Sequence, residues 1–364
     1  MRILLVTDAW SPQVNGVVRT LQTTCEYLGK KGHQVHVIHP GQFRTLPCPT
    51  YPDIRLAIFP GRGVAGVMEA FEPEAIHIAT EGPLGLSARR WCLDRDLPFT
   101  TSFHTQFPEY LRLRAPVPTR WTYALLQRFH EPAVRTLVPT PTQRNHLEAR
   151  GFGHLRLWSR GVDTTVFHPE EPFRLPLPGP IAIYMGRVAV EKNIESFLNL
   201  DLPGSKVVIG DGPDLARLRQ QFPSAHFMGP LFGRDLARHL AGGDVFVFPS
   251  RTDTFGLVLL EAMACGLPVA AYPVQGPLDV ISHGISGFLS EDLRQAVLAA
   301  LLLDRSKAVA LARTYAWDTS VDTFISHLAP VAESHRFVAE AAPPFELSPQ
   351  NSHRPKPVAS LGER

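Results

Sequence analysis

Two halves of the chain share one pattern: a short apolar run, a turn that contains glycine, and a stretch with helical periodicity. In the first half, RILLVTD is followed by WSPQVNGVVRTLQTTCEYLGKKG and then by HQVHVIHP. In the second half, PIAIYMG leads into RVAVEKNIESFLNL and then SKVVIG. Short apolar strands that alternate with helices are typical of parallel sheets covered by helices on both faces. The pattern therefore predicts an α/β fold with two doubly wound, Rossmann-like domains.

A proline-rich stretch separates the two predicted domains. Residues 167–180, FHPEEPFRLPLPGP, cannot form a helix or a central strand, because proline has no amide hydrogen to donate. We predict a first domain over residues 1–166, a linker over 167–180 and a second domain over 181–316. Further strands are expected at 75–78, 99–103 and 137–140 in the first domain, and at 226–228, 244–249 and 268–272 in the second.

The end of the chain divides into a helix and a tail. A helical pattern over 318–328 predicts a last helix. Residues 337–364 are rich in proline and polar side chains, a composition typical of disorder.

Composition narrows the classes of function. A hydrophobic content of 44% and a charged content of 19% describe a soluble globular protein. The formal net charge of +2 argues against a nucleic-acid partner bound over the whole surface. The 4 cysteines are widely spaced and show no metal-ligand pattern, so we expect neither a zinc site nor a disulfide framework. We find no signal peptide and no apolar window of about 20 residues, so we expect a cytoplasmic protein.

The run from residue 244 to 266 carries the clearest chemical pattern. DVFVFPS predicts a buried strand, and FGLVLLEAMA predicts a helix with its N-cap among residues 252–254. Amides at the start of this helix favour an anion such as a diphosphate. Asp253 precedes the helix and Glu261 lies two turns into it, which separates them by at most roughly 12 Å at helical rise.

That spacing suits two carboxylates on either side of a diphosphate. One carboxylate would accept hydrogen bonds from sugar hydroxyls and the other from ribose hydroxyls. The alternative is that Asp253 caps the helix and Glu261 is an ordinary surface residue. The local pattern leaves both interpretations open.

Several segments together resemble the retaining glycosyltransferases of family 4, which have the two-domain GT-B fold. Their donor signature is E-x7-E, and this chain has Asp253-x7-Glu261, with an aspartate in place of the first glutamate. The resemblance extends to about residue 328 and implies an enzyme that moves a hexose from a nucleotide diphosphate sugar. It also implies that a last helix, within residues 317–330, crosses back to the first domain.

The segment GRVAVEKN, residues 186–193, resembles the family's G-R-x-x-x-E-K-N motif. The resemblance implies that Arg187 and Lys192 hold the donor diphosphate, so that neither a metal nor another cofactor is required. The alternative is a solvated cation pair near a helix start. A metal-binding D-x-D spacing at 94–96 is interpreted as a solvated loop.

Other segments extend the implied site. SPQVNGVVRT resembles the family's glycine loop, GDGP its nucleotide-pocket turn, TSFHTQFPEYL its F-H-T segment and SRGVDTTVFHP the close of its first domain. Taken alone, each could be an ordinary turn or a structural histidine. The resemblance implies catalytic roles for His104, Arg187, Lys192 and Asp253, and donor contacts from Asn15, Gly16, Arg160, Gly186, Gly210, Gly212, Thr254, Phe255, Gly256, Leu257 and Glu261.

The loops PQVNGVVRTL and FHTQFPEYLR most resemble the bacterial GDP-mannose-dependent α-mannosyltransferases, with sulfoquinovosyl and glucosyl lipid synthases nearby. The expected donor is therefore GDP-mannose, with UDP-linked glucose, glucuronate or sulfoquinovose as alternatives, and the expected acceptor is a lipid, lipid-linked sugar or glycan. No side chain stands out as a covalent nucleophile, so we expect front-side displacement. Rival functions are a nucleotide-sugar epimerase, a phosphorylase relative and a non-catalytic nucleotide-sugar-binding protein.

A basic and aromatic segment at 109–135 bears on membrane association. Such a mixture suits an anionic membrane surface, at the inner face of the plasma membrane. The alternative is an amphipathic helix packed on its own domain. The residues concerned are Arg112, Arg114, Arg120, Arg128 and Arg135, with Tyr110, Trp121, Tyr123 and Phe129 among them.

Overall fold

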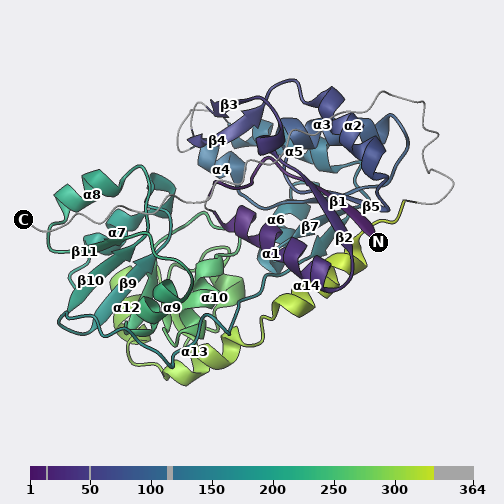
Figure 1. Ribbon diagram of the computed structural model, residues 1–364. Helices are drawn as coiled ribbons and strands as arrows, with labels where there is room; N and C mark the ends of the chain where they lie inside the picture. Colours follow the sequence, from purple (N-terminus) through teal and green to yellow (C-terminus); the bar gives the residue numbers. More distant parts are fainter. Residues whose placement is uncertain (14, 49–50, 113–117, 332–364) are drawn as a thin grey trace, which may run out of the picture.

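The computed structural model describes residues 1–13, 15–48, 51–112 and 118–331. Two α/β domains, each built on a parallel sheet of 6 strands, lie side by side (Figure 1). The predicted α/β class with two doubly wound domains is therefore confirmed. The expected tail at 337–364 lies outside the described residues.

In the first domain the sheet has the order β2-β1-β5-β6-β7-β8. Its strands are β1 (Arg2–Val6), β2 (Gln34–Ile38), β5 (Ala75–Ile78), β6 (Thr100–Ser102), β7 (Arg135–Val138) and β8 (Leu155–Leu157). The helices are α1 (Gly16–Lys30), α2 (Gly61–Phe71), α3 (Pro83–Leu93), α4 (Phe107–Arg112), α5 (Thr119–His130) and α6 (Pro141–Glu148). An antiparallel ribbon of β3 (Thr45–Cys48) and β4 (Tyr51–Ala57) is added to it.

The second domain repeats this plan with the order β11-β10-β9-β12-β13-β14. Its strands are β9 (Ile181–Met185), β10 (Ser205–Ile209), β11 (His226–Gly229), β12 (Val245–Phe248), β13 (Val269–Ala271) and β14 (Gly287–Leu289). The helices are α7 (Ile194–Leu198), α8 (Leu215–Gln221), α9 (Gly233–Ala241), α10 (Leu257–Ala264), α11 (Pro277–Val280), α12 (Leu293–Ala300) and α13 (Arg305–Ala312). In both sheets the strand order reverses beside the first strand, which is where such sheets bind ligands.

Strand β1 explains why the apolar runs are continuous. Leu4 and Val6 pack into one core cluster, while Ile3 and Leu5 pack into another on the opposite face. Because successive side chains of a strand point to opposite faces, a strand covered on both sides buries every position and is typically a continuous apolar run.

The last helix, α14 (Trp317–His327), returns to the first domain. Phe324 and Leu328 join the core cluster that contains Ile3 and Leu5. Arg135 Nη1 also donates to the carbonyl of His327 at 2.9 Å. The yellow helix α14 in Figure 1 therefore lies against the first domain, although it follows the second domain in sequence.

Two local predictions about helices were wrong. Helix α10 begins at Leu257 and its N-cap is Gly256, at φ 83°, whereas residues 252–254 were expected to cap it. Phe255 is buried in the second domain's core, so the chain turns at Gly256 before the helix starts. The single helix expected after residue 186 is instead a 3-10 turn, η2 (Val190–Lys192), followed by α7. Asn193, at φ 52°, separates them and donates to the carbonyl of Pro249 at 3.0 Å.

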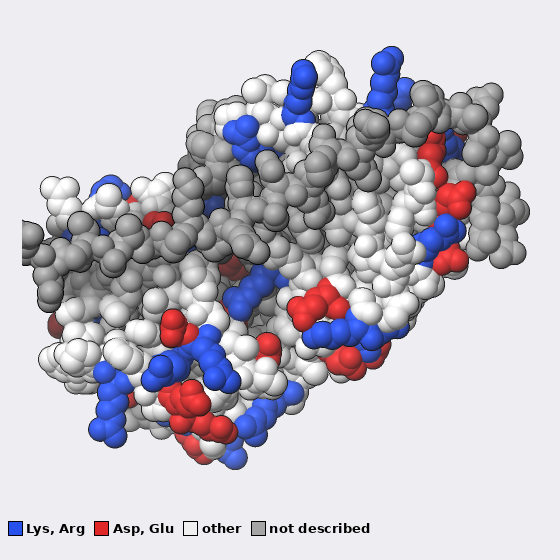
Figure 2. Space-filling model, in the orientation of Figure 1, with Lys and Arg blue, Asp and Glu red and all other residues white. Residues whose placement is uncertain are grey.

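The surface of the molecule carries mixed charge. On the face shown in Figure 2, Lys and Arg side chains are interspersed with Asp and Glu side chains over both domains. Within the described part of the chain, no helix combines the length and apolarity that a membrane span requires.

Candidate active site

The loops that follow β1 and β6 meet the loop between β12 and α10 from the other domain. Thr254 Oγ1 donates to the carbonyl of His104 at 2.7 Å. A Cβ placed on Gly16 would lie 3.7 Å from Leu257 Cδ1, so the start of α1 lies against the start of α10. The structure thus brings four of the predicted site residues together across the boundary between the domains.

Asp253 is held by a cation from its own domain. Its Oδ1 lies 2.5 Å from Lys192 Nζ, and both side chains are mostly buried. Its Oδ2 is buried and makes no hydrogen bond within the described residues. Asp253 therefore does not cap α10, and it retains one acceptor oxygen for a hydroxyl group.

Glu261 is similar, but its cation comes from the first domain. Its Oε1 lies 2.6 Å from Arg19 Nη1. Glu261 is only 5% exposed, which excludes the interpretation as a surface residue. Burial raises the pKa of its carboxyl to about 7, and Arg19 opposes that rise. Oε2 is buried and has no hydrogen-bond partner among the described residues.

A cavity of about 200 Å³ lies beside this ion pair. Its lining includes Arg19, Glu261 and Leu257, and also Asp163 from the segment before the linker. The cavity is large enough for a small polar group, and two of its walls come from different domains.

The glycine turns next to β9 and β10 are explained by packing. A Cβ on Gly210 would lie 1.9 Å from the carbonyl oxygen of Gly186, and one on Gly212 would lie 2.3 Å from that of Val188. Gly210 and Gly212 therefore allow the two loops to touch. Arg187 belongs to the loop after β9, between Gly186 and Val188, and its carbonyl accepts a 2.8 Å bond from the hydroxyl of Tyr184.

The imidazole ring of His104 contacts the guanidinium group of Arg160. Arg160 Nη2 lies 3.2 Å from His104 Nδ1, and Arg160 Nη1 donates to the carbonyl of Trp158 at 2.6 Å. Arg160 is 4% exposed, and burial lowers its pKa to about 9. Burial is the main cause that lowers the pKa of His104 well below its usual value, and the positive charge of Arg160 is the second cause. His104 Nε2 is buried and makes no hydrogen bond within the described residues.

Asn15, which was predicted to contact the donor, caps the first helix of the first domain. Its side-chain oxygen accepts hydrogen bonds from the amides of Val17 and Val18, each at 3.0 Å, and so caps α1. This capping fixes the direction in which α1 leaves β1, and with it the position of Arg19 one turn later.

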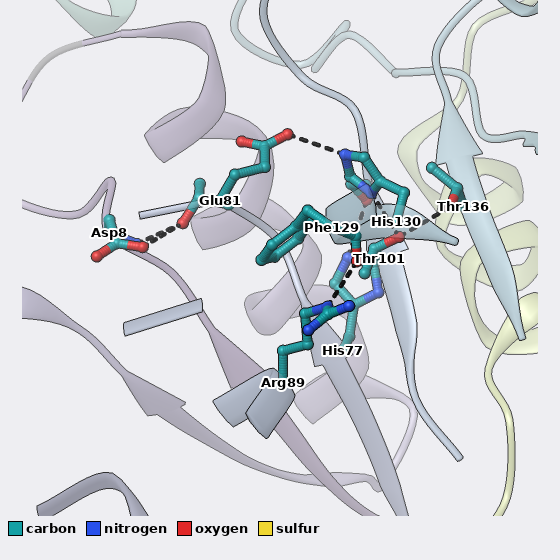
Figure 3. A network of polar contacts seen from close by, with 10 residues as sticks. Asp8, His77, Glu81, Arg89, Thr101, Phe129, His130 and Thr136 are labelled. Atoms are coloured by element: carbon teal, nitrogen blue, oxygen red, sulfur yellow. Dashed lines mark hydrogen bonds and ion pairs between the residues drawn. The ribbon is translucent and has the colours of Figure 1, made fainter. Parts of the chain in front are cut away.

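A buried polar network lies at the ends of the first domain's strands (Figure 3). Glu81 reaches His130 Nε2 at 3.1 Å, and His130 Nδ1 lies 2.9 Å from Thr101 Oγ1. Asp8 accepts the amides of Leu84 at 2.9 Å and Gly85 at 3.3 Å at the start of α3. These partners fix the loops that carry the first-domain side of the site.

Sequence reasoning missed Arg19, Asp8 and the Glu81–His130 pair. Arg19 was present in the quoted glycine loop, three residues after Gly16 and therefore on a neighbouring part of the same helix face. Its spacing from Gly16 was a usable signal. The partners of Asp8 and Glu81 are far apart in sequence, and no local pattern indicates them.

The basic and aromatic segment is only partly as expected. Tyr123 and Phe129 are buried, and Arg135 points inward to the carbonyl of His327, so these three residues do not form a surface patch. Trp121 and Leu125 of α5 are 66% and 68% exposed. Arg114 lies outside the described residues, as does the side chain of Tyr110.

Sequence comparisons give the family. The sequence model for Glycosyltransferase Family 4 matches residues 14–166, and the model for Glycosyl transferases group 1 matches residues 179–304. The chain is 31% identical to the GDP-mannose-dependent alpha-mannosyltransferase of Mycolicibacterium smegmatis, over 90% of this chain and 96% of that protein. It is 33% identical to a sulfoquinovosyl transferase of Arabidopsis thaliana, over 80% of this chain and 64% of that protein.

A comparison of structures gives the fold. The sucrose-phosphate synthase of Thermosynechococcus elongatus superimposes with a TM-score of 0.69 at 19% identity, over 89% of this chain and 97% of that one. The two family models match one domain each, and the superposition covers both domains, so sequence and structure give the same two-domain architecture. The chain belongs to glycosyltransferase family 4 and has the GT-B fold.

Proposed function

We propose that this glycosyltransferase moves a hexose, with retention of configuration, from a nucleotide diphosphate sugar to a hydroxyl group of a lipid or glycan. One observation carries the proposal: Glu261 is buried and the side chain of Asp253 is mostly buried, and each has one oxygen paired with a cation and one buried oxygen without a hydrogen-bond partner among the described residues. Unpaired buried acceptors are costly unless a ligand supplies hydroxyl donors. A sugar on Asp253 and a ribose on Glu261 would supply them.

The diphosphate would lie between the two carboxylates. The first amides of α10 have no partners within the helix and favour an anion. Arg187 and Lys192 approach from the loop after β9 and would neutralise the departing charge. With this arrangement the proposed site requires neither a metal nor another cofactor.

The proposed reaction is a front-side displacement. The bond from the anomeric carbon to the diphosphate oxygen breaks, and the acceptor oxygen bonds to that carbon on the same face. The acceptor's proton passes to the departing diphosphate, so charge and atoms balance without a base from the protein. Since the pKa of His104 lies well below its usual value, this residue serves as a neutral hydrogen-bond donor and takes no proton.

GDP-mannose is the first candidate donor, because the chain aligns with a GDP-mannose-dependent enzyme over almost the full length of both proteins. Donors linked to UDP are the second candidate, supported by the sulfoquinovosyl transferase. The aspartate at position 253 is one methylene shorter than the family's glutamate, and it lies where the sugar would be recognised.

Titration calorimetry with GDP-mannose, UDP-glucose and UDP-glucuronate tests the donor, and product analysis with lipid extracts tests the transfer. Glu261→Gln should weaken binding of the responding donor at least tenfold, because a hydrogen bond to a charged group contributes roughly 1.5–3 kcal/mol. Glu291→Gln, an exposed glutamate of the same domain, is the control and should bind normally. Equal affinity in Glu261→Gln and the wild type would refute the site.

We also propose that α5 rests on an anionic membrane surface and so presents a lipid acceptor. One face of α5 packs inward through Leu126 and Phe129, while Trp121 and Leu125, one turn apart, are exposed beside Arg120 and Arg128. Exposed apolar residues with basic neighbours are typical of helices that lie in a membrane interface. The location this implies is the inner face of the plasma membrane.

Sedimentation with vesicles tests the membrane surface. The wild type should bind vesicles that contain phosphatidylglycerol and should not bind those of phosphatidylcholine alone. Trp121→Asp and Leu125→Asp should each lower the bound fraction about tenfold or more, since each removes roughly 1.5–3 kcal/mol of apolar burial. Leu302→Asp changes a leucine of the second domain that is 87% exposed and should have no effect. Equal loss in all three variants would contradict a specific role for α5.

A further inference from the structure

The ion pair between Arg19 and Glu261 joins the two domains at the proposed nucleotide site. Arg19 belongs to α1 of the first domain, and Glu261 belongs to α10 of the second. Their charged atoms are 2.6 Å apart, and the Arg19 guanidinium also lies 5.4 Å from the ring centre of Phe167, at the beginning of the linker. Any motion that opens the cleft by carrying α1 away from α10 separates this pair.

The surroundings of Glu261 make Arg19 its main counter-charge. Among the described residues Arg19 is its ion-pair partner, and the thiol of Cys265 lies one turn further along α10. Glu26, Lys30 and Asp163 line the adjoining cavity, and none of them is paired with Glu261. Lys30 is instead 2.7 Å from Glu26 and balances its charge.

A buried carboxylate without a counter-charge favours its protonated form. Burial already raises the pKa of Glu261 to about 7, and Arg19 is the group that opposes the rise. A protonated carboxyl has lost acceptor capacity and accepts the hydroxyls of a ribose less well. The carboxylate is therefore an efficient ribose ligand only while Arg19 is beside it.

We propose that Arg19 is a positioning residue that keeps Glu261 ionised and oriented while the cleft is closed, so that nucleotide affinity is coupled to domain closure. This inference rests on the proposed function, because it assumes that Glu261 binds the ribose. The arrangement of the two carboxylates supports it: Asp253 takes its cation, Lys192, from its own domain, whereas Glu261 takes its cation from the opposite domain. Asp253, on the sugar side, keeps its cation whether the cleft is open or closed. Glu261, on the ribose side, gains its cation only when the cleft closes.

The experiment measures GDP and UDP binding to the full-length protein by calorimetry between pH 5.5 and 9, in the wild type and in Arg19→Met. Nucleotide affinity should fall as the pH falls through the pKa of Glu261, because the ionised form binds the ribose. Without the arginine that pKa is higher, so the decline should move to higher pH by about one unit or more. At pH 7.5 the variant should bind about threefold more weakly or worse, because a smaller fraction of Glu261 is ionised, and the loss should shrink toward pH 9.

Two further variants make the result specific. Arg19→Lys keeps the charge and should retain most of the wild-type pH profile. Arg90→Met removes an exposed cation of the same domain that does not line the cavity, and should bind like the wild type. A loss in Arg19→Met that is the same at every pH would overturn the inference, and so would an unchanged affinity.

A double variant separates this inference from the proposed function. If Arg19 acts through Glu261, then Arg19→Met should have little effect in a chain that already carries Glu261→Gln. If Glu261→Gln alone leaves nucleotide binding unchanged, the ribose assignment is wrong. If Glu261→Gln weakens binding but Arg19→Met does not shift the pH profile, only the coupling to closure is wrong.

Discussion

At the scale of single residues, the pair Arg160 and His104 shows how hydrogen bonding defines a side chain's chemistry. A guanidinium donates hydrogen bonds and cannot accept them, so the contact at 3.2 Å makes His104 Nδ1 an acceptor. In the neutral imidazole the proton then lies on Nε2, which is buried and has no partner among the described residues. His104 therefore offers one N–H group to the cleft.

This arrangement predicts the pH behaviour of His104. The charged groups and imidazoles that act on it are Arg160, His77 and His130, and each of them, like burial, disfavours its protonation. In the wild type, ¹⁵N spectra of His104 should show the Nε2–H tautomer unchanged from pH 5.5 to 8. Arg160→Met should mix the two tautomers and raise the pKa, while burial, the larger cause, should still keep that pKa below its usual value. A wild-type midpoint near the ordinary value of about 6.5 would contradict the assignment.

The sequence was sufficient to propose individual site residues but not to pair them. Lys192, Asp253 and Glu261 were recognisable from their motifs, and the structure shows them in two ion pairs, Lys192 with Asp253 and Arg19 with Glu261. The pairings themselves depend on contacts between residues that are 61 positions apart or more. No local pattern encodes such a contact. The sequence motif that contains Arg19 therefore did not indicate that Arg19 pairs with Glu261.

At the scale of elements, the strands were predicted more accurately than the helix starts. Residues 75–78 form β5 as predicted, and all of them are buried; His77, its polar member, is accommodated because its ring nitrogens contact the hydroxyls of Thr100 and Ser102. The start of α10 was wrong, because residues 252–254 have good capping side chains but are used elsewhere. Asp253 pairs with Lys192 and Thr254 donates to the carbonyl of His104. Tertiary contacts thus outweighed local preference.

A tertiary contact also explains why the helix expected after residue 186 is broken after η2. Residues 187–200 have a helical pattern, but Asn193 adopts a left-handed conformation and donates to the carbonyl of Pro249. This bond ties the turn that carries Lys192 to the end of β12. A continuous helix would satisfy local propensity, whereas the break holds Lys192 within reach of Asp253.

At the scale of the whole molecule, the repeated pattern of the sequence was enough to predict two sheets with separate cores. Ile183 and Phe246 centre one cluster in the second domain, and Leu4 and Ile76 centre one in the first. The contacts that close the cleft could not be predicted in the same way. They join polar side chains of loops and helices in different domains, such as Arg19 with Glu261, and the partners are far apart in sequence.

The contact between α6 and α11 is the clearest of these closing interactions. Thr142 donates to Asp279 Oδ1 twice, from its amide at 3.1 Å and from its hydroxyl at 3.0 Å. Gln106 and Gln275 form a further hydrogen bond between the same two domains. Since neither core includes these side chains, they affect the balance between open and closed states more than they affect folding.

Asp279→Ala should therefore open the cleft without unfolding either domain. Two hydrogen bonds to a charged acceptor are lost, each worth roughly 1–3 kcal/mol, so the closed fraction should fall and kcat/KM should drop about tenfold. Small-angle scattering should show a larger radius of gyration for the free variant, and the difference should shrink when the donor nucleotide binds.

The same variant separates closure from stability. Its Tm should stay within about 2 °C of the wild type, because the substitution removes no core packing. Asp94→Ala, which changes an exposed aspartate that directly follows α3 and pairs with Arg90, is the control and should alter neither the scattering nor the rate. If Asp279→Ala lowered Tm strongly and left the radius of gyration unchanged, the contact would serve folding. If it enlarged the radius but left kcat/KM intact, closure would not limit the reaction, and the coupling through Arg19 would then be confined to nucleotide binding.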